Sequence, residues 1–438
     1  MIKVVKFGGT SLADASAIKN VANIIRADDS RRYVVPSAPG KRFNLDTKVT
    51  DLLYQAYDSV GSDEFEENFS KITDRFNEII FDLGIQLSLQ DQYETIKENF
   101  INQIGREYAA SRGEYLNGQI IANYLGYEFI DASQVIFIDD NGNNITEYTD
   151  HYLTTRLKGV ERAVIPGFYG ADKQGNIKTF SRGGSDITGS IVAKAVHADL
   201  YENWTDVSGF LIADPRIVKN PASISIITYN ELRELSYMGA SVLHENAVFP
   251  VRKEGIPINI KNTFRPQDPG TMIVETTAHK PAYTITGVAG KKGFTAVSIE
   301  KGMMNSEIGF ARKVLQVFED NGLSIEHMPS GIDTLTVVVN TEDFVAKEQQ
   351  VLAGLHRMVN PDHIDLESDL ALVAVVGRGM KDSRGCAGKL FGALGKEGIN
   401  VKMIDQGSSE LNIICGVKNH KFEAAINAIY NAFMNENK

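Results

Sequence analysis

Short apolar runs alternate with longer stretches of helical spacing through the first 275 residues of the chain. The short runs are rich in β-branched and aromatic residues, and a turn containing Gly, Ser or Pro follows each one. Strands are predicted at Lys3–Phe7, Tyr33–Pro36, Glu128–Ile130, Arg162–Pro166, Leu200–Asn203 and Pro257–Lys261. Strands that alternate with helices in this way predict an α/β fold with an open, mainly parallel sheet between helices.

Residues 62–108 interrupt this alternation. They are rich in Asp, Glu, Asn and Gln, and their apolar residues recur at helical spacing, at Phe69, Ile72, Phe76, Ile79 and Ile80. This pattern predicts a helical insertion in the α/β domain.

A pattern of strand, helix, two strands and helix occurs twice after a Pro- and Gly-rich stretch at residues 265–282. The first copy is predicted as strand Phe294–Glu300, helix Gly309–Asn321 and strands Leu323–His327 and Thr334–Asn340. The second copy is predicted as strand Leu370–Val376, helix Gly385–Glu397 and strands Ile399–Ile404 and Glu410–Gly416. Two βαββαβ modules are therefore predicted, although two unrelated strand–helix stretches remain an alternative. The expected domains are residues 1–278, with the insertion at about 62–108, then 284–365 and 366–438.

Composition excludes several classes of protein. The 438 residues carry a net charge of −11, which argues against nucleic acid or an anionic membrane as the main partner. Cys386 and Cys415 are the only cysteines, too few for a four-thiolate metal site, and buried reduced thiols are expected. No apolar run reaches membrane-spanning length, and the chain begins directly with a charged strand, so a cytoplasmic location is expected.

The strand at Lys3–Phe7 runs directly into a pair of glycines, Gly8 and Gly9, followed by the hydroxyls of Thr10 and Ser11. Glycines let the main chain approach an anion closely, and successive N–H groups in such a turn hold negative charge. Lys6 adds a point charge that can follow a phosphoryl group. The motif predicts a phosphate-binding loop, although a tight turn alone would explain the two glycines.

Three more clusters of small and polar residues follow predicted strands. They are Val-Val-Pro-Ser-Ala-Pro-Gly at residues 34–40, Phe-Ser-Arg-Gly-Gly-Ser-Asp at 180–186, and Trp-Thr-Asp-Val-Ser-Gly at 204–209 with Ala-Asp-Pro-Arg at 213–216. Taken singly, each cluster is compatible with a simple turn. Ligands of open α/β sheets bind at the carboxyl ends of the strands, so the four loops together predict one binding crevice.

These motifs resemble those of the aspartokinases. The matching sequences are Lys-Phe-Gly-Gly-Thr-Ser, Ser-Arg-Gly-Gly-Ser-Asp, Trp-Thr-Asp-Val-x-Gly followed by Asp-Pro-Arg, and Met-Gly-Ala-x-Val-Leu-His. The resemblance spans nearly the whole chain and implies an amino acid kinase fold with tandem C-terminal ACT modules, of the monofunctional type. It implies phosphorylation of the L-aspartate side chain to 4-phospho-L-aspartate, the first step toward lysine, threonine and methionine, with ATP as co-substrate and Mg²⁺.

The resemblance also assigns site residues. Catalytic roles fall on Lys6, Gly8, Gly9 and Asp186; substrate binding on Thr50, Glu114, Arg182 and Ser185; and nucleotide binding on Thr10, Ser11, Ser37, Thr205, Asp206, Leu211, Arg216 and Ser241. Making an acyl phosphate requires bringing two anions together, so catalysis is expected to rest on alignment and charge neutralisation. No protein metal cage is expected, because the phosphates would hold most of the Mg²⁺ coordination.

Simpler structural roles compete with some of these assignments. Glu114 is compatible with a helix N-terminal acid that the helix dipole favours, and Asp206 and Asp214 with turn or cap residues. Lys41 and Arg42 are expected to be solvated loop charges rather than phosphate ligands. His197 lies among apolar neighbours and is expected to be a packed structural histidine, as is His244.

The chain departs from the family at two nucleotide positions. Ser241 stands where many members have a lysine that reaches the nucleotide, with Glu245 in place of a following proline. Leu211 stands where a tyrosine is often found. A positive contact to the nucleotide is therefore missing, and Lys253, Lys261 or Arg252 are candidates to replace it.

The first repeat is expected to bind an amino-acid effector. Its candidate contacts, by analogy with the ACT modules of the family, are Met304, Ser306, Gly309, Phe310, Ser324, Ile325 and Glu326. The expected effector is lysine, threonine or both, at an interface between ACT modules of a homodimer or dimer of dimers. Modules that only dimerise are the alternative.

Two other functions remain open at this point. Another kinase of the same fold, such as a glutamate 5-kinase or an acetylglutamate kinase, would share the phosphate loops. A catalytically idle effector-binding protein would explain Ser241 and Leu211, but Lys6, Arg182 and Asp186 argue for an enzyme.

Overall fold

The computed structural model describes residues 1–181, 183–240, 243, 245–381 and 383–435. Contacts between Cα atoms divide the chain into two compact units. The N-terminal unit is Met1–Phe210, Ile224–Tyr229 and Val242–Thr277, and the C-terminal unit is Leu211–Ser223, Asn230–Ser241 and Ala278–Lys438. The domain limits expected from the sequence stay predictions.

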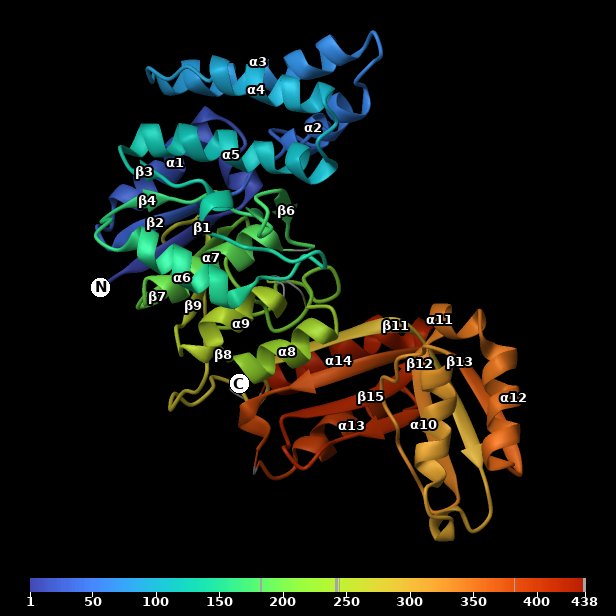
Figure 1. The fold of residues 1–438 in the computed structure, drawn as a ribbon. Helices are drawn as coiled ribbons and strands as arrows, with labels where there is room; N and C mark the ends of the chain where they lie inside the picture. Colours follow the sequence, from blue (N-terminus) through green and yellow to red (C-terminus); the bar gives the residue numbers. More distant parts are fainter. Residues whose placement is uncertain (182, 241–242, 244, 382, 436–438) are drawn as a thin grey trace. The chain divides into compact units, whose positions relative to one another are not determined.

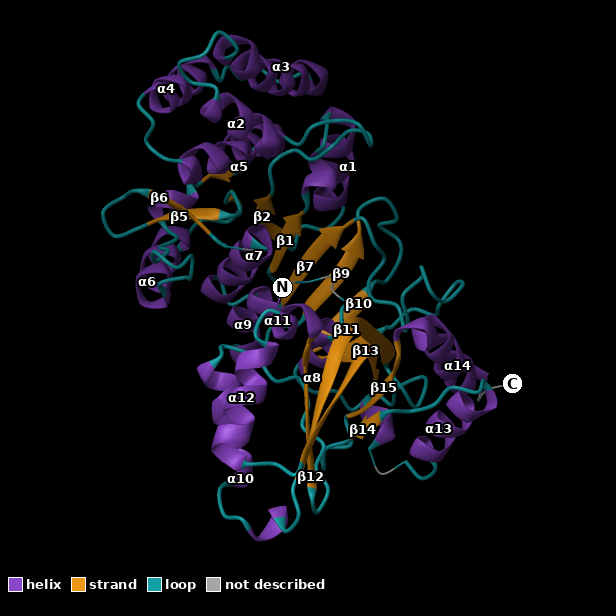
Figure 2. Cartoon of the chain, turned by 90° about the vertical axis from the view of Figure 1, so that its right-hand side faces the viewer, coloured by secondary structure: helices purple, strands orange, loops and turns teal. Residues whose placement is uncertain are grey.

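A large, mainly parallel sheet forms the centre of the N-terminal unit. Its described strands lie in the order β3-β4-β2-β1-β7-β9-β10-β8, and only the β9–β10 pair is antiparallel. Their bounds are β1 Lys3–Phe7, β2 Arg31–Pro36, β3 Glu128–Phe129, β4 Ala163–Val164, β7 Leu200–Thr205, β8 Ile226–Thr228, β9 Ile258–Asn262 and β10 Thr271–Val274, with β5 Tyr169–Ala171 and β6 Ile177–Thr179 as a separate antiparallel pair. Figure 2 shows β2, β1, β7 and β9 side by side.

Helices cover the sheet (Figure 1). Helix α7 packs against β1, β2 and β7 and also contacts α9, while α5 packs against β2, β3 and β4. The helices of this unit are α1 Ala15–Arg26, α2 Val49–Asp58, α3 Phe65–Leu83, α4 Gln90–Ile101, α5 Arg106–Leu125, α6 Thr146–Leu157, α7 Gly184–Ala195 and α9 Glu245–Lys253, with short 3₁₀ turns η1 Gly9–Leu12 and η2 Ala132–Gln134. Helices α3 and α4 occupy the stretch where an insertion was expected, and Figure 1 shows them lying side by side.

The local sequence explains these elements. Four of the five residues of β1 are buried, as expected for a strand covered on both faces. Asp14 caps α1 by accepting a hydrogen bond from the Ala17 amide (2.8 Å), which satisfies one of the unpaired amides at the helix start. In α3, the predicted apolar face is buried, and Gly84 ends the helix in the left-handed conformation.

The C-terminal unit contains the two predicted repeats on one sheet. Its described strands are β11 Gly287–Glu300, β12 Thr334–Asn340, β13 His363–Val376, β14 Met403–Asp405 and β15 Asn412–Lys418, in the order β12-β11-β13-β15-β14. Its helices are α8 Tyr229–Tyr237, α10 Phe310–Asp320, α11 Thr341–Val345, α12 Glu348–Val359, α13 Cys386–Lys396 and α14 Phe422–Met434, with 3₁₀ turns η3 Met304–Ser306, η4 Arg378–Met380 and η5 Asn419–Lys421. The predicted fold class is confirmed.

The two repeats share their central strands. Residues 294–300 of β11 pair with β12 and with residues 363–370 of β13, whereas residues 287–292 pair with residues 371–376 of β13. Residues 370–376 of β13 in turn pair with residues 412–418 of β15. Each long strand therefore belongs to both repeats, and the second repeat uses a strand segment that precedes the first in the sequence.

Some expectations about this fold were wrong. The strand expected at Leu323–His327 is reduced to an isolated bridge between His327 and Val338. His197 is exposed at the end of α7 with a φ of 49°, so it is not a packed histidine, and His244 lies outside the described residues. Both cysteines are buried, as expected. None of the described helices is long and apolar enough to cross a membrane.

Glu231 of α8 is the most deeply buried carboxylate of the C-terminal unit to have a described ion pair, with its side chain fully inaccessible. It pairs with the Arg378 guanidinium (2.9 Å) and accepts hydrogen bonds from the Arg378 amide (2.8 Å) and the Thr286 hydroxyl (2.6 Å). Removing one partner of a buried ion pair leaves the charge of the other without compensation. We therefore expect Glu231→Ala to lower the free energy of unfolding by about 3–5 kcal/mol. Denaturant titration would measure this.

The exposed pair between Arg106 and Asp58 (2.8 Å) provides the control. Ion pairs in contact with water contribute little, so Asp58→Asn should leave the denaturation midpoint nearly unchanged. If the Glu231 and Asp58 variants lose the same free energy of unfolding, the buried pair does not stabilise the protein more than an exposed one.

Candidate active site

Lys6 and Asp186 meet at the carboxyl ends of the central strands. Lys6 is nearly buried at the end of β1, and its Nζ lies 2.6 Å from Oδ1 of Asp186 in the first turn of α7. The register of β1 against β7 places Asn203 beside Lys6, and Asn203 Nδ2 donates to the same Asp186 oxygen (2.9 Å). The ammonium is thus held in a fixed position. Sequence reasoning missed Asn203, which had no motif of its own.

The two glycines after β1 have different surroundings. Gly8 is in extended conformation and its N–H already donates to the Trp204 carbonyl (3.1 Å), so the catalytic role expected for Gly8 stays a prediction. Gly9 begins the 3₁₀ turn η1, where the first N–H groups have no acceptor within the turn. The amides of Gly9 and Thr10 are therefore better suited to bind an anion.

A second loop, at the end of β2, packs directly on the first. The Ser37 amide donates to the Phe7 carbonyl (3.1 Å), and the Gly40 amide donates to the Gly9 carbonyl (2.9 Å). From α5, Asn117 Nδ2 donates to the Ser37 carbonyl (2.7 Å). The two glycine-containing loops, residues 8–11 and 37–40, thus form one structural unit.

Gly40 has no room for a side chain. An added Cβ would lie 2.7 Å from the Gly9 carbonyl carbon and 2.8 Å from the Thr10 nitrogen, both of them backbone atoms. We expect Gly40→Ala to separate the two loops, lowering the free energy of unfolding by about 1–3 kcal/mol and reducing kcat. Thermal melting and an activity assay would measure the two effects.

Gly388 in α13 is the matched control, because an added Cβ there meets nothing within 4 Å. Gly388→Ala should keep wild-type kcat and raise stability slightly, since alanine favours a helix over glycine. A Gly40→Ala variant that behaves in the same way would show that the close contact is unimportant.

A cavity of about 690 Å³ opens beside these loops. Its lining combines the loops with the segment that follows them and with helices α2 and α5, namely Gly9, Thr10, Ser37, Ala38, Pro39, Gly40, Lys41, Arg42, Phe43, Asn44, Lys48, Thr50 and Glu114. Five predicted site residues therefore meet in one cavity, although they are far apart in the sequence. Lys48, at its rim, was not predicted.

Glu114 lies in the middle of α5, which excludes a helix N-terminal acid as its explanation. Gly113 lets α5 approach the second loop, because an added Cβ would lie 2.8 Å from Ala38 Cβ. Glu114 is 6% exposed, and its Oε2 atom has no hydrogen-bond partner among the described residues. Burial raises the pKa of Glu114 to about 8, against the smaller opposing effects of backbone hydrogen bonds and the Arg112 charge.

Other predicted residues have structural partners instead. Ser11 is 1% exposed, and its hydroxyl bonds that of Thr263 (2.8 Å), so its contact with a nucleotide stays a prediction. Arg42 pairs with Asp46 and Glu78, which agrees with a loop charge rather than a phosphate ligand. Ser185 packs closely against Gly167, next to Asp186. Arg182 lies outside the described residues.

The nucleotide candidates divide between the two units. Thr205 is the last residue of β7 and Asp206 follows it, and the Thr205 hydroxyl donates to the Asp206 carboxylate (3.2 Å). Leu211 and Arg216 belong to the C-terminal unit, where Arg216 is exposed and bonds Asp214 (2.6 Å). Ser241 lies outside the described residues.

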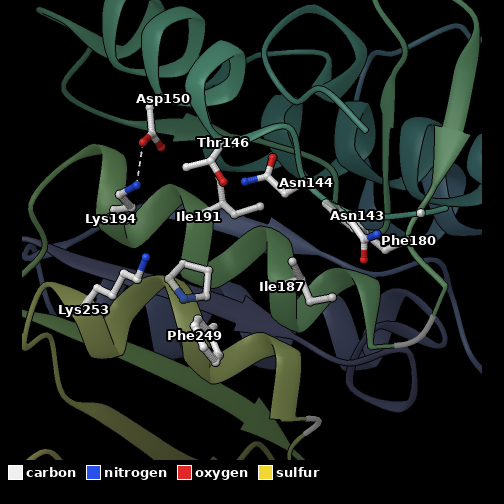
Figure 3. Close-up of a pocket in the computed structure, with 12 residues that line it drawn as sticks. Asn143, Asn144, Thr146, Asp150, Phe180, Ile187, Ile191, Lys194, Phe249 and Lys253 are labelled. Carbon is white, nitrogen blue, oxygen red and sulfur yellow. Dashed lines mark hydrogen bonds and ion pairs between the residues drawn. The ribbon is translucent and has the colours of Figure 1, made fainter. Parts of the chain in front are cut away.

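None of the three candidates to replace a lysine at position 241 is among the residues that line the cavity beside Gly9. Arg252 bonds Glu275 (3.1 Å), and Lys261 Nζ lies 5.3 Å from the centre of the Trp204 ring, where burial lowers its pKa. Lys253 lines a second cavity of about 310 Å³ between α6, α7 and α9, which also contains the ion pair of Lys194 with Asp150 (2.5 Å; Figure 3). None of the predicted catalytic residues lines this second cavity.

The effector candidates lie in the first repeat. Met304 and Phe310 are part of its buried core and Ile325 packs against that core, whereas Ser306, Gly309 and Ser324 are exposed. Glu326 accepts a hydrogen bond from the Tyr237 hydroxyl (2.6 Å), and burial together with this contact raises the pKa of Tyr237 to about 12. Glu326 thus already has a partner within the C-terminal unit.

Comparison with known proteins matches both units. Residues 1–262 match the amino acid kinase family and residues 373–433 match the ACT domain. The chain is 38% identical to aspartokinase 3 of Bacillus subtilis (strain 168), over 99% of this chain and 98% of the relative.

Solved structures give the same result. The structure of Clostridium acetobutylicum aspartate kinase is 51% identical, covers 99% of both chains and superposes with a TM-score of 0.88. E. coli aspartokinase III in complex with aspartate and ADP is 24% identical, covers 99% of both chains and shares the fold with a TM-score of 0.73.

Proposed function

The chain belongs to the aspartokinases of the amino acid kinase family, and we propose that it transfers the γ-phosphoryl group of ATP to the side-chain carboxylate of L-aspartate. The product would be 4-phospho-L-aspartate, the first intermediate toward lysine, threonine and methionine. The observation that carries this proposal is the cavity that joins the Gly9 loop to the buried carboxylate of Glu114.

The charges around this cavity complement aspartate. The substrate carries two carboxylates and one ammonium group. Glu114 has a carboxylate oxygen without a described partner, which suits the substrate ammonium, while Lys41 and Lys48 place positive charge at the rim for the carboxylates. Thr50 adds a hydroxyl, and Arg182 is proposed to grip the α-carboxylate.

The reaction needs alignment more than proton transfer, because the side-chain carboxylate of aspartate is already ionised at neutral pH. Lys6 is proposed to neutralise charge on the transferring phosphoryl group, with Asp186 and Asn203 holding its ammonium in place. The amides of Gly9 and Thr10 would bind phosphate oxygens. The remaining proposed nucleotide contacts are Ser37, Thr205, Asp206, Leu211, Arg216 and the segment at Ser241.

The residues present fit an Mg²⁺ ion that arrives with ATP. Among the residues that the structure describes, no group of three or more Asp, Glu, His or Cys side chains is placed to hold a metal. Mg²⁺ commonly uses one or two carboxylates and takes its other ligands from phosphates and water. Asp186 is the carboxylate beside Lys6, and the ion would supply charge neutralisation of the phosphates.

We also propose feedback control through the C-terminal repeats, with lysine, threonine or both as effectors. The ACT match and the exposed groups around Ser306, Gly309 and Ser324 support this. An effector ammonium at Glu326 would compete with the Tyr237 hydroxyl. An effector acts only through different affinities for two states. The homodimer and the cytoplasmic location expected from the sequence remain proposals.

Trapping of the acyl phosphate with hydroxylamine tests the proposed function. The full chain would be incubated with MgATP and L-aspartate, L-glutamate or N-acetylglutamate, each with and without lysine and threonine. We expect hydroxamate with aspartate alone, and less of it when an effector is present. Product with another acceptor would identify a different kinase of the fold, and no product with any acceptor would indicate an idle effector-binding protein.

A further inference from the structure

We propose that Arg75, on the inserted helix α3, is a positioning residue that holds the loops of the aspartate cavity in place. Helix α3 contributes no residue to the described cavity lining, so Arg75 acts through other groups. This inference rests on the proposed function, because it concerns the same cavity.

One guanidinium nitrogen of Arg75 connects the segment just after the first glycine loop with the end of the second. Its Nη2 donates to the Ala13 carbonyl (2.8 Å) and to the Gly40 carbonyl (3.0 Å). Ala13 directly follows the η1 turn that begins at Gly9, and the Gly40 amide donates to the Gly9 carbonyl. A single planar group therefore joins the residue that follows the η1 turn to the end of the second loop.

The other terminal nitrogen fixes the segment that continues the second loop. Arg75 Nη1 lies 2.9 Å from Oδ2 of Asp46. Asp46 in turn accepts hydrogen bonds from the Arg42 amide (2.9 Å) and from the Arg42 guanidinium (3.0 Å), so it closes the turn that carries Phe43 and Asn44 along the cavity. The Arg42 guanidinium holds the pKa of Asp46 well below its usual range.

Burial makes this arrangement specific. The side chains of Arg75 and Asp46 are 4% and 9% exposed. A buried guanidinium needs acceptors in the plane of its fork, and the described acceptors of Arg75 all lie in segments that border the cavity. Lysine has a single ammonium and cannot reproduce that geometry. The insertion thereby acquires a role in positioning aspartate and the phosphate loop.

The test compares Arg75→Met with Arg31→Met in the full chain. Arg31 is the matched control because its side chain is only 12% exposed, pairs with Glu202 (2.8 Å) and bonds the Ile24 carbonyl (2.6 Å), but lies at the opposite end of β2 from Ser37. For Arg75→Met we expect KM for aspartate to rise about tenfold and kcat to fall about tenfold, because misplaced loops lose alignment. Arg31→Met should lower the melting temperature without changing either constant.

Two further variants separate the connections. Asp46→Asn weakens the Arg75–Asp46 pair and the hold on residues 41–48 but keeps the Arg75 bonds to the Ala13 and Gly40 carbonyls, so KM for aspartate should rise about tenfold while kcat stays within about twofold of wild type. For Arg75→Lys, both KM for aspartate and kcat should lie between the values of Arg75→Met and wild type. These variants decide the matter if Arg75→Met does not fold.

Amide hydrogen exchange provides a readout that needs no activity. We expect Arg75→Met to speed exchange in residues 9–14 and 38–48, and Arg31→Met to leave both segments as in wild type. Equal kinetic and exchange effects from the two arginine variants would overturn the proposal, as would an unchanged KM in Asp46→Asn. If the wild-type chain forms no acyl phosphate from aspartate, the proposed function fails, whereas the exchange data still decide whether Arg75 holds the loops.

Discussion

Replacing Lys6 by alanine should lower kcat about 10³-fold while the protein remains folded. Lys6 is the cation held 2.6 Å from Asp186 at the end of β1, directly before the Gly9 loop. Removing one preorganised group that stabilises transition-state charge costs about 10²–10³ in rate. Because transfer of a phosphoryl group to a carboxylate joins two anions, we expect a loss at the upper end of that range. Steady-state kinetics at saturating aspartate and MgATP would measure it.

Lys3→Ala is the control on the same strand. Lys3 also forms ion pairs, with Asp28 (2.7 Å) and Glu202 (3.3 Å), but lies at the other end of β1. Its loss should reduce stability and leave kcat within about twofold of wild type. A Lys6→Ala variant with kcat within tenfold of wild type would refute the assignment of Lys6 to phosphoryl transfer.

Glu114→Gln should raise KM for aspartate about 100-fold with a much smaller effect on kcat. The glutamine amide keeps the shape of the side chain but lacks the charge that pairs with the substrate ammonium, and charged hydrogen bonds of this kind contribute about 1.5–3 kcal/mol. Glu107→Gln is the control on the same helix, where Glu107 accepts a hydrogen bond from the Thr179 amide (2.9 Å). A normal KM in Glu114→Gln would show that the ammonium binds elsewhere.

The raised pKa of Glu114 makes binding depend on pH. Only the ionised carboxylate pairs with the ammonium, so kcat/KM for aspartate should rise with pH up to about 8 and then level off. Glu114→Gln should abolish that rise. A flat wild-type profile between pH 6 and 8 would contradict the buried, protonated state.

The same pKa shift affects stability in the opposite direction. The pKa of Glu114 is about 8 in the folded state, whereas a glutamate in the unfolded chain has the ordinary value of 4.5. Between pH 4.5 and about pH 8 the folded state therefore binds more protons than the unfolded state. The free energy of unfolding should therefore fall as pH rises through this window, and Glu114→Gln should remove that contribution.

The fold was predictable where the pattern is local. The apolar run of β1 has the predicted bounds, and helices α10 and α13 lie within a residue or so of their predicted limits. The sharing of β11 and β13 between the repeats was not predictable, because it pairs residues 287–292 with a strand about 80 positions later. Such pairing depends on tertiary packing rather than on local propensity.

The site was predictable as a set of motifs but not in its contacts. The sequence pointed to Lys6, Asp186 and Glu114. In the structure, Lys6 pairs with Asp186, and Glu114 lines the cavity. The sequence itself did not indicate that Ser11 would be buried against Thr263 or that the Gly8 amide would donate to the neighbouring strand β7. Arg75 was hidden in a stretch read only as an insertion, because nothing local marks its acceptors.

The number of protons released when L-aspartate binds tests whether the buried Glu114 receives the substrate ammonium. Calorimetry at pH 7 in two buffers of different ionisation enthalpy would count the protons. A carboxyl with a pKa of about 8 is mostly protonated at pH 7, so wild type should release most of one proton per aspartate bound, and Glu114→Gln should release none. Binding without proton release, or equal release from both proteins, would rule out Glu114 as the group that receives the ammonium.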